Sequence, residues 1–330
     1  MSGSSLRHHV WALAMLGAIA ANGSAAAETY VTFSALNGYD THAYSINADG
    51  VVTGQAAGTD TGYGFVRAAD GTITTFAVDD NTAGIAINRR GWIAGDSCSM
   101  EGTCHGLLRK PSGKIVTFDP LGSIYTLVSA INDAGTVAGY WMDANAAFHG
   151  FLRTADGTIT TFDPAASVAT WANAINAKGD VAGYYLDALN QTHGFLRAAD
   201  GIITSFDAGE GIDTLAYGIN GKGAIVGSVN LTACFERTPH GKIRIFEQGQ
   251  TQTNPTQASA INSHGLIIGI YALDQAPYSS AYVGSPKSGF TSFNVNGGQT
   301  QPYSINDGGV IAGSYYDSNT HRLNGFLRMP

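Results

Sequence analysis

Three histidines hold the same place in successive copies of a short motif, 44 residues apart: His105, His149 and His193. Histidine is the commonest ligand of transition metals and titrates near neutral pH, so such a series could bind metal or transfer protons. However, equivalent positions on neighbouring repeat units are too widely separated for one ion to bridge all three. We therefore expect each histidine to form hydrogen bonds within its own unit, for example to the loop that precedes it.

Pairs of Asp and Asn stand in the segments before the second and third histidines: Asp143 with Asn145, and Asp187 with Asn190. Oxygen ligands at such spacing can coordinate calcium. Asx turns, in which the side chain bonds the backbone two residues on, explain the same residues equally well. Calcium is therefore kept as a candidate, and no other cofactor is predicted.

These residues belong to a repeat that spans the chain. The dipeptide Ile-Asn occurs seven times at intervals of 41 to 44 residues, with its asparagine at Asn47, Asn88, Asn132, Asn176, Asn220, Asn262 and Asn306. A period in the forties with Gly-containing turns indicates a propeller or a solenoid. The fourth copy predicts strands at 170–176, 180–185, 193–197 and 202–206, joined by turns that glycine and Asn or Asp favour. Four antiparallel strands per unit are typical of a propeller blade.

The two ends of the chain complement each other. The seventh copy stops at Arg328, one strand short, and the segment Tyr-Val-Thr-Phe at 30–33 matches the fourth strand Ile-Thr-Thr-Phe at 159–162. Pairing the ends would remove the exposed edges that invite aggregation. We therefore predict an all-β fold, a seven-bladed β-propeller of four-stranded blades, closed by the N-terminal strand completing the last blade.

The repeated motif carries a resemblance to a known family. Its full copies are His-Gly-Leu-Leu-Arg at 105–109 and His-Gly-Phe-Leu-Arg at 149–153 and 193–197, with partial copies at 63–67 and 324–328. The sequence resembles the extracellular HAF-repeat proteins over essentially the whole chain after residue 27. Copies at 233–237 and 280–283 depart from the motif. The resemblance implies an exported repeat protein and no particular biochemical activity.

The N-terminal segment predicts export. A basic start, an apolar run at 10–21 and three alanines at 25–27 are typical of a secretory signal peptide over residues 1–27. Residues 28–330 then form one domain, which we expect to be a monomer without a membrane span, in the periplasm or outside the cell. The net charge of −8 makes nucleic acid an improbable partner.

The three cysteines suit an oxidising compartment. Cys98 and Cys104 flank a five-residue loop between two expected strands, so a disulfide closing that hairpin is predicted. Cys234 stands where other copies carry a strand glycine, which predicts a buried, unreactive thiol.

The innermost expected strands combine constant and variable positions. A threonine begins all seven: Thr41, Thr82, Thr126, Thr170, Thr214, Thr256 and Thr300. Because every copy has it, we expect its hydroxyl to bond backbone groups, and we assign the Ile-Asn pair to the scaffold for the same reason. The positions one and three residues after the threonine vary, and they share one face of the strand. Their aromatic, amide and histidine members are the candidate ligand-binding residues at the channel mouth: His42, Tyr44, Trp171, Asn173, Tyr217, Gln257, Gln301 and Tyr303.

Neither variable row contains Asp, Glu, Lys or Arg, which weighs against general acid–base catalysis on the axis. The favoured function is a binding or interaction module. Its ligand would be a glycan, a small polar molecule or an exported protein, bound at the channel mouth and at the long-loop face, which carries the loops after the second and fourth strands. The alternative is a lyase or hydrolase acting on a polysaccharide or lactone, with or without a metal. It would need His42 or a loop histidine to converge with Asp40 or Asp213. A purely structural, exported matrix protein is a third alternative.

Overall fold

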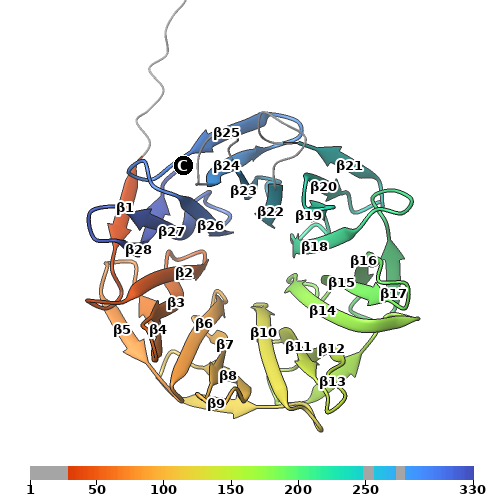
Figure 1. The fold of residues 1–330 in the computed structure, drawn as a ribbon, viewed down its shortest axis with the longest axis horizontal. Coiled ribbons are helices and arrows are strands. Elements are labelled where there is room, and N and C mark those ends of the chain that lie inside the picture. The colour runs from red at the N-terminus through yellow and green to blue at the C-terminus, as the bar shows by residue number, and fades with distance from the viewer. Residues whose placement is uncertain (1–28, 248–255, 273–278) are drawn as a thin grey trace, which may run out of the picture.

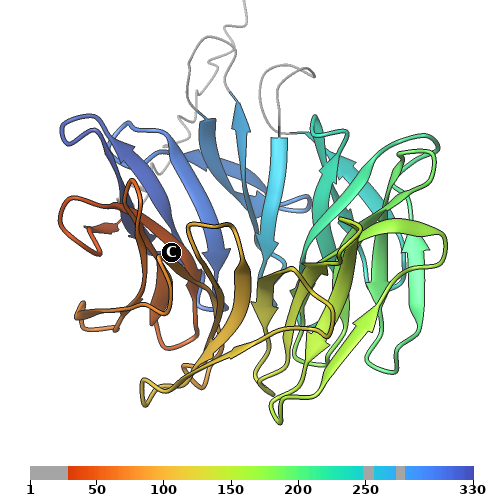
Figure 2. The same cartoon turned by 60° about the horizontal axis from the view of Figure 1, so that its bottom comes forward.

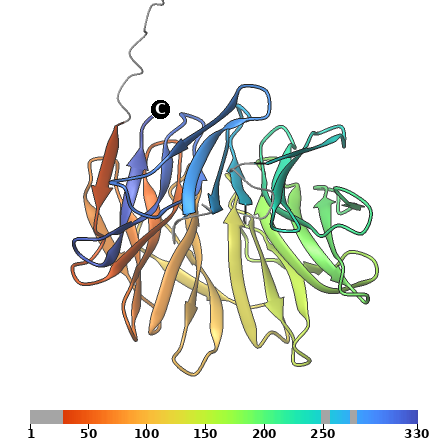
Figure 3. The ribbon, with the colours of Figure 1, turned by 45° about the horizontal axis from the view of Figure 1, so that its top comes forward.

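The computed structural model describes residues 29–247, 256–272 and 279–330. Within these ranges the chain forms 28 strands and no helix, so the all-β class is confirmed. The strands build a ring of twisted sheets, seen down its axis in Figure 1 and tilted in two directions in Figures 2 and 3. No described segment is a helix long and apolar enough to cross a membrane. The expected signal peptide, residues 1–27, lies outside the described residues.

Each repeat contributes strands to one sheet, and the repeat units are numbered 1 to 7 along the chain. The innermost strands are β2 (Asp40–Ile46), β6 (Asn81–Ile87), β10 (Tyr125–Ile131), β14 (Ser167–Ile175), β18 (Thr214–Ile219), β22 (Thr256–Ile261) and β26 (Thr300–Ile305). The second strands are β3 (Val52–Ala57), β7 (Ile93–Cys98), β11 (Val137–Met142), β15 (Val181–Asp187), β19 (Ile225–Val229), β23 (Ile267–Ala272) and β27 (Ile311–Asp317).

The outer half of each unit completes its sheet. The third strands are β4 (Gly62–Arg67), β8 (Cys104–Arg109), β12 (Phe148–Arg153), β16 (Thr192–Arg197), β20 (Ala233–Arg237), β24 (Ser279–Ser285) and β28 (Arg322–Arg328). The outermost strands are β5 (Ile73–Phe76), β9 (Ile115–Phe118), β13 (Ile159–Phe162), β17 (Ile203–Phe206), β21 (Ile243–Phe246), β25 (Gly289–Phe293) and, in unit 7, β1 (Tyr30–Phe33).

Successive strands within a unit pair antiparallel. Units 1, 2 and 3 form one continuous 12-stranded sheet, because single parallel pairings join Gly62 to Asn81 and Tyr125 to Cys104. In unit 7, β1 pairs with β28 over four residues, from Tyr30 opposite Arg328 to Phe33 opposite Gly325. The strand from the N-terminal end therefore occupies the outermost position of the last unit.

Packing between strands explains the repeated Gly-Phe-Leu-Arg sequence. A methyl group at Gly64 on β4 would come within 2.3 Å of Phe76 Cζ on β5, so that position admits little besides glycine. The guanidinium of Arg109, one unit further on, lies 5.1 Å from the centre of the Phe76 ring, which is a cation–π contact. The phenylalanine inside the motif is fully buried, as at Phe65. These residues therefore build the scaffold.

β1 makes the same contacts as the other outermost strands. A methyl group at Gly325 would come within 2.6 Å of Phe33 Cζ, and the guanidinium of Arg67 in unit 1 lies 5.0 Å from the Phe33 ring. The corresponding Arg197 lies 5.0 Å from the Phe162 ring on β13. Phe33 thus joins units 7 and 1 by the chemistry that joins units 3 and 4.

The Ile-Asn pairs hold the centre of the ring together. Each isoleucine is buried in a different hydrophobic cluster. Each asparagine amide donates to the backbone carbonyl of the asparagine in the next unit, at 3.0 to 3.3 Å, and Asn306 returns to Asn47. The amide oxygen accepts backbone N–H groups of its own turn, as Asn220 does from Lys222 and Ala224. The scaffold assignment of these pairs is confirmed.

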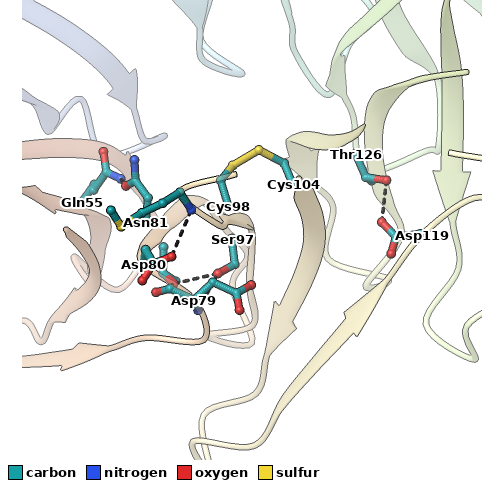
Figure 4. The surroundings of a disulfide bond; sticks show 11 residues. Gln55, Asp79, Asp80, Asn81, Ser97, Cys98, Cys104, Asp119 and Thr126 are labelled. Carbon is teal, nitrogen blue, oxygen red and sulfur yellow. Dashed lines mark hydrogen bonds between the residues drawn. A yellow bond between two sulfur atoms is a disulfide. The ribbon is translucent and has the colours of Figure 1, made fainter. Parts of the chain in front are cut away.

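The cysteine predictions are also confirmed. Cys98 and Cys104 form a disulfide across the ends of β7 and β8, as Figure 4 shows. Cys234 is buried, with its sulfur 3.3 Å from the Tyr282 hydroxyl. Burial raises the pKa of the Cys234 thiol to about 12, so it stays protonated and unreactive at neutral pH.

Candidate functional site

A β-bulge interrupts every innermost strand at the same place. The register between innermost and second strands slips there, for example between Val128 and Ala130 and between Ala172 and Ala174. A bulge leaves a residue outside the regular pairing and redirects its side chain. The residues three positions after the initial threonine stand at these slips: Tyr44, Ile85, Ser129, Asn173, Tyr217, Ser259 and Tyr303. They are called the bulge ring below.

The bulge ring lines a cavity of about 350 Å³ on the axis. The isoleucines of the Ile-Asn pairs also line it, and they line a second cavity of about 400 Å³ on the side of the asparagine turns. An apolar ring therefore lies between the two cavities. At the asparagine end each side-chain amide already donates to the backbone carbonyl of the next asparagine, whereas the bulge ring offers phenol, hydroxyl and amide groups around an uncharged lining.

The bulge ring contains four of the eight predicted ligand-binding residues, namely Tyr44, Asn173, Tyr217 and Tyr303. Within the ring, the Asn173 amide donates to the Ala216 carbonyl at 2.8 Å. The other four predicted residues do not line this cavity. Each stands two positions before a bulge-ring residue on its innermost strand: His42, Trp171, Gln257 and Gln301. Ligand binding at all eight stays a prediction.

Aromatic rings continue from the bulge ring through units 3 to 5. Trp171 stacks on Tyr184 with ring centres 5.0 Å apart, and Tyr184 meets Tyr217 edge to face at 6.1 Å. Phe148 lies 5.6 Å from Trp171 and 5.8 Å from Tyr140. Trp171 is therefore one member of a connected aromatic wall that leads into the cavity.

A second aromatic group joins units 7 and 1. His42 stacks on Tyr44 at 5.6 Å, and Tyr44 meets Tyr303 edge to face at 5.2 Å. His42 Nδ1 is buried and has no hydrogen-bond partner among the described residues. Burial lowers the pKa of His42, although the charge of Asp40 opposes the shift. His42 is thus a neutral imidazole with one free nitrogen at neutral pH.

The bulge-ring tyrosines are neutral hydroxyls. Burial raises the pKa of Tyr303 to about 12, and burial also raises the pKa values of Tyr44 and Tyr217 further above their usual range. A phenol that stays protonated can donate one hydrogen bond and accept others. The ring can therefore recognise a polar ligand without supplying charge.

Asp96 is an acidic residue that the two variable rows did not include. It lies on the second strand β7, directly opposite Ala83 of β6. Its side chain therefore shares the sheet face of the residue that directly follows the innermost threonine. Burial raises the pKa of Asp96 to about 7, while the backbone N–H of Val128 partly opposes the shift. Burial raises the pKa values of Tyr44, Tyr125 and Tyr140, and the charge of Asp96 adds a smaller contribution in the same direction.

Comparison with known proteins identifies the architecture. No protein-family model matches the chain, and no curated protein sequence matches it. A streptogramin B lyase superposes with a TM-score of 0.62 at 13% identity, over 91% of this chain and 97% of that one. A catalytically inactive virginiamycin B lyase from Staphylococcus aureus with quinupristin gives 0.61 at 14% identity, over 92% and 100%. The β-propeller domain of the trilobed protease from Pyrococcus furiosus gives 0.58 at 8% identity, over 87% and 95%.

The fold is a β-propeller. At these identities the likeness concerns the fold alone, because propellers host many unrelated activities.

The motif histidines of the propeller are held by carboxylates. His105 Nδ1 lies 2.6 Å from Asp119, His149 Nδ1 lies 2.7 Å from Asp163, and His193 Nδ1 lies 2.8 Å from Asp207. Each of these aspartates follows the outermost strand of the same unit. On the other ring nitrogen, Asp143 lies 3.7 Å from His149 and Asp187 lies 3.4 Å from His193. The expected hydrogen bonds within the unit are therefore present at all three histidines, and His193 alone also has a hydrogen bond to the carboxylate that precedes it, Asp187.

The threonine hydroxyls are also bonded. Thr126 and Thr170 donate to the second oxygens of Asp119 and Asp163 at 2.6 Å, the first of which is drawn in Figure 4. Other members accept backbone N–H groups instead: Thr41 from Ala35, Thr82 from Val78, Thr214 from Ala208 and Thr300 from Val295. The prediction of backbone partners is confirmed for these four, and the carboxylate partners are an addition that the repeat alone did not reveal.

The candidate calcium ligands form Asx turns. Asp143 accepts the N–H groups of Asn145 and Ala147, and Asp187 accepts those of Leu189 and Gln191, at 2.8 to 2.9 Å. Asn190 takes a left-handed φ of 62° within its turn. Among the described residues no group of three or more His, Cys, Asp or Glu side chains is arranged to hold a metal ion. The turn interpretation accounts for these residues.

The carboxylates proposed for the enzymatic alternative accept hydrogen bonds from the backbone of a neighbouring unit. Asp40 accepts the Leu323 N–H at 2.9 Å, and Asp213 accepts the Thr192 N–H at 2.9 Å. Each therefore bridges to the start of the third strand of the preceding unit, β28 for Asp40 and β16 for Asp213. Of these two carboxylates, only that of Asp40 affects the pKa of His42.

Proposed function

We propose that this chain is an exported β-propeller that binds a glycan or another small polar ligand in the cavity of the bulge ring. The observation that carries the proposal is the ring itself. Seven structurally equivalent bulges direct tyrosine, serine, asparagine and isoleucine side chains at one cavity of about 350 Å³, a volume at the lower end of small-molecule sites. The nearby Ile-Asn positions are the same in all seven units, whereas the bulge positions vary. The scaffold therefore does not dictate which residue stands at a bulge.

We infer that the ring has seven blades and is closed by the N-terminal strand. In support, seven repeat units each contribute one four-stranded group, β1 pairs with β28, and Asn306 bonds to Asn47 across the junction. Export is supported by the sequence of residues 1–27, and membership of the HAF-repeat proteins is supported by the repeated motif. The packing of Gly, Phe and Arg gives that motif a structural cause.

The long-loop face offers a site for the exported-protein alternative. This face carries the loops that follow second and outermost strands. Several large apolar side chains are exposed on those loops: Met100, Leu121, Leu189 and Leu231 are 72%, 100%, 85% and 53% exposed. These side chains are the apolar contacts that a protein partner on this face would use. A protein partner would then cover the mouth of the channel.

A lyase or hydrolase remains the second candidate function, and Asp96 is the observation that favours it. A carboxyl group with a pKa of about 7 is about half protonated at neutral pH, and its protonated form can act as a general acid. Activity on polysaccharides or lactones that disappears in Asp96→Asn would support this function. Activity unchanged in that variant would remove it.

The binding proposal is tested by screening glycans and small polar molecules for stabilisation of the protein, followed by calorimetry on the variant Tyr217→Phe/Tyr303→Phe. This variant keeps both rings and removes two hydroxyls. Arg89→Ala at the asparagine end of the channel is the matched control. We expect binding to weaken about tenfold in the double variant and to be unchanged in the control. Equal affinities in all three proteins would refute a ligand in the bulge ring.

A further inference from the structure

A third cavity, of about 370 Å³, lies between units 1 and 2 on the side of the asparagine turns. Residues of both units line it, and the two units are neighbours in the ring of Figure 1. Its charged lining residues are three arginines and one aspartate, namely Arg89, Arg90, Arg109 and Asp49, so its net formal charge is 3 − 1 = +2. The whole chain carries a net charge of −8, so this cavity is a local exception.

The motif arginine of unit 2 lacks the acid that follows it elsewhere. In units 1, 3 and 4 an aspartate stands three residues after the motif arginine: Asp70, Asp156 and Asp200. Burial lowers the pKa values of Arg153 and Arg197, and the charges of Asp156 and Asp200 oppose that shift. Unit 2 has Ser112 at this position, and burial lowers the pKa of Arg109 with no opposing carboxylate among the described residues.

The asparagine turn of unit 2 adds a second cation to the same cavity. Arg90 is exposed and stands at the repeat position that Asp49 occupies in unit 1. None of the ion pairs among the described residues includes Arg90, Arg109 or Asp49. Arg89 differs, because its Nε lies 4.0 Å from the Asp133 carboxylate. We therefore do not count Arg89 among the binding groups.

The two turns that hold these arginines pack against each other. A methyl group at Gly91 would lie 3.4 Å from Pro111 Cγ, and Lys110 Nζ lies 4.8 Å from the centre of the Trp92 ring. The turns at 88–92 and 110–114 are thus held side by side. Arg90 and Arg109 can therefore act on one ligand.

We propose that Arg90 and Arg109 bind the carboxylate or phosphate group of an anionic sugar in this cavity. Guanidinium groups present paired N–H donors that match the oxygens of such anions. Asp49 lines the same cavity and can accept hydrogen bonds from the hydroxyl groups of a sugar. Its volume lies within the range of small-molecule sites.

This site is separate from the bulge ring. The lining of the bulge-ring cavity contains no arginine, and none of the bulge-ring residues lines the cavity between units 1 and 2. The inference therefore goes beyond the proposed function and does not depend on it.

The experiment is calorimetric titration of D-glucuronate, D-glucose 6-phosphate and D-glucose into the wild type at low salt. We expect saturable binding of at least one of the two anions, at least about tenfold tighter than glucose, and weaker binding at high salt. The anion that binds more tightly identifies the preferred group, carboxylate or phosphate.

Three variants locate the site. Ser112→Asp installs the acid of units 1, 3 and 4 and should fold, because the Lys114 N–H bonds Ser112 as the Thr72 N–H bonds Asp70. It should abolish the preference for the anion, because the charge of Arg109 is then matched. Arg90→Gln should weaken anion binding about tenfold. Lys178→Gln removes the same charge from the same turn position in unit 4 and should leave binding unchanged.

Several results would overturn the site. They are no saturable binding of either anion, equal binding of the anions and glucose, an unchanged preference in Ser112→Asp, or equal losses in Arg90→Gln and Lys178→Gln. Melting temperatures of the variants separate loss of the site from loss of the fold. Tyr217→Phe/Tyr303→Phe should bind the anion as the wild type does, and a loss there would move the anion to the bulge ring.

Discussion

At the scale of single residues, Asp96 departs most clearly from the repeat. Sequence comparison among the seven copies selected Tyr44, Asn173, Tyr217 and Tyr303, which line the cavity, because they stand at a repeat position whose residue varies. It missed Asp96, which reaches the same face from the second strand. Aligning second strands would have exposed an acid where other units carry Ser, Tyr, Gln or Ile. Its pKa depends on burial, which only the folded chain defines.

The raised pKa of Asp96 predicts how stability depends on pH. The folded-state pKa of about 7 lies above the ordinary value of 3.8, so folding favours the protonated form. The associated stability is complete below about pH 4 and is lost as pH rises towards 7, by up to about 4 kcal/mol. Asp96→Asn, which cannot ionise, should therefore become more stable than the wild type as pH rises from 4 to 8. Parallel denaturation curves for both proteins across this range would contradict the assignment.

At the scale of elements, each innermost strand has a bulge that directs a variable side chain into the cavity and a following turn that links adjacent units. The turn asparagine was assigned to the scaffold from its constancy, and the structure adds that its amide links adjacent units. The bulges could not be predicted, because a one-residue slip against the second strand leaves no mark in the sequence. They explain why the variable residue two positions before the isoleucine reaches the cavity.

The asparagine ring predicts a specific cost for breaking one link. Asn220→Ala removes the bond to the Asn262 carbonyl and the bonds from Lys222 and Ala224 N–H groups. We expect a loss of about 1–3 kcal/mol in the free energy of unfolding, measured by chemical denaturation. Lys222→Ala, in the same turn, is the control and should be close to neutral. Similar losses in the two variants would show that the ring contributes little.

At the scale of the whole molecule, the sequence repeat predicted the β-propeller and the strand that completes the last unit. Phe33 on β1 makes contacts equivalent to those of Phe162 on β13, with Arg67 and Arg197 each 5.0 Å from the respective ring. The sequence could not predict these arginine contacts, because they connect different units. The contacts of β1 with unit 1 are thus of the same kind as those at the junction of units 3 and 4.

The proposed closure of the ring by β1 predicts equal losses of stability for two distant substitutions. Phe33→Ala and Phe162→Ala remove the same ring from the same surroundings, so each should reduce stability by about 3 kcal/mol. Chemical denaturation of both variants measures this directly. A cost for Phe33→Ala well below that for Phe162→Ala would mean that β1 is a dispensable strand and that the ring holds without it.

The central claim is that the bulge ring binds the ligand. The most direct measurement is calorimetric titration of a ligand found by screening into the wild type, Tyr217→Phe/Tyr303→Phe and Arg89→Ala. The account predicts an affinity about tenfold weaker for the double variant alone, because two hydroxyls inside the cavity are lost. Unchanged affinity in the double variant, or a loss confined to Arg89→Ala, would contradict the claim and move the site to the asparagine end of the channel.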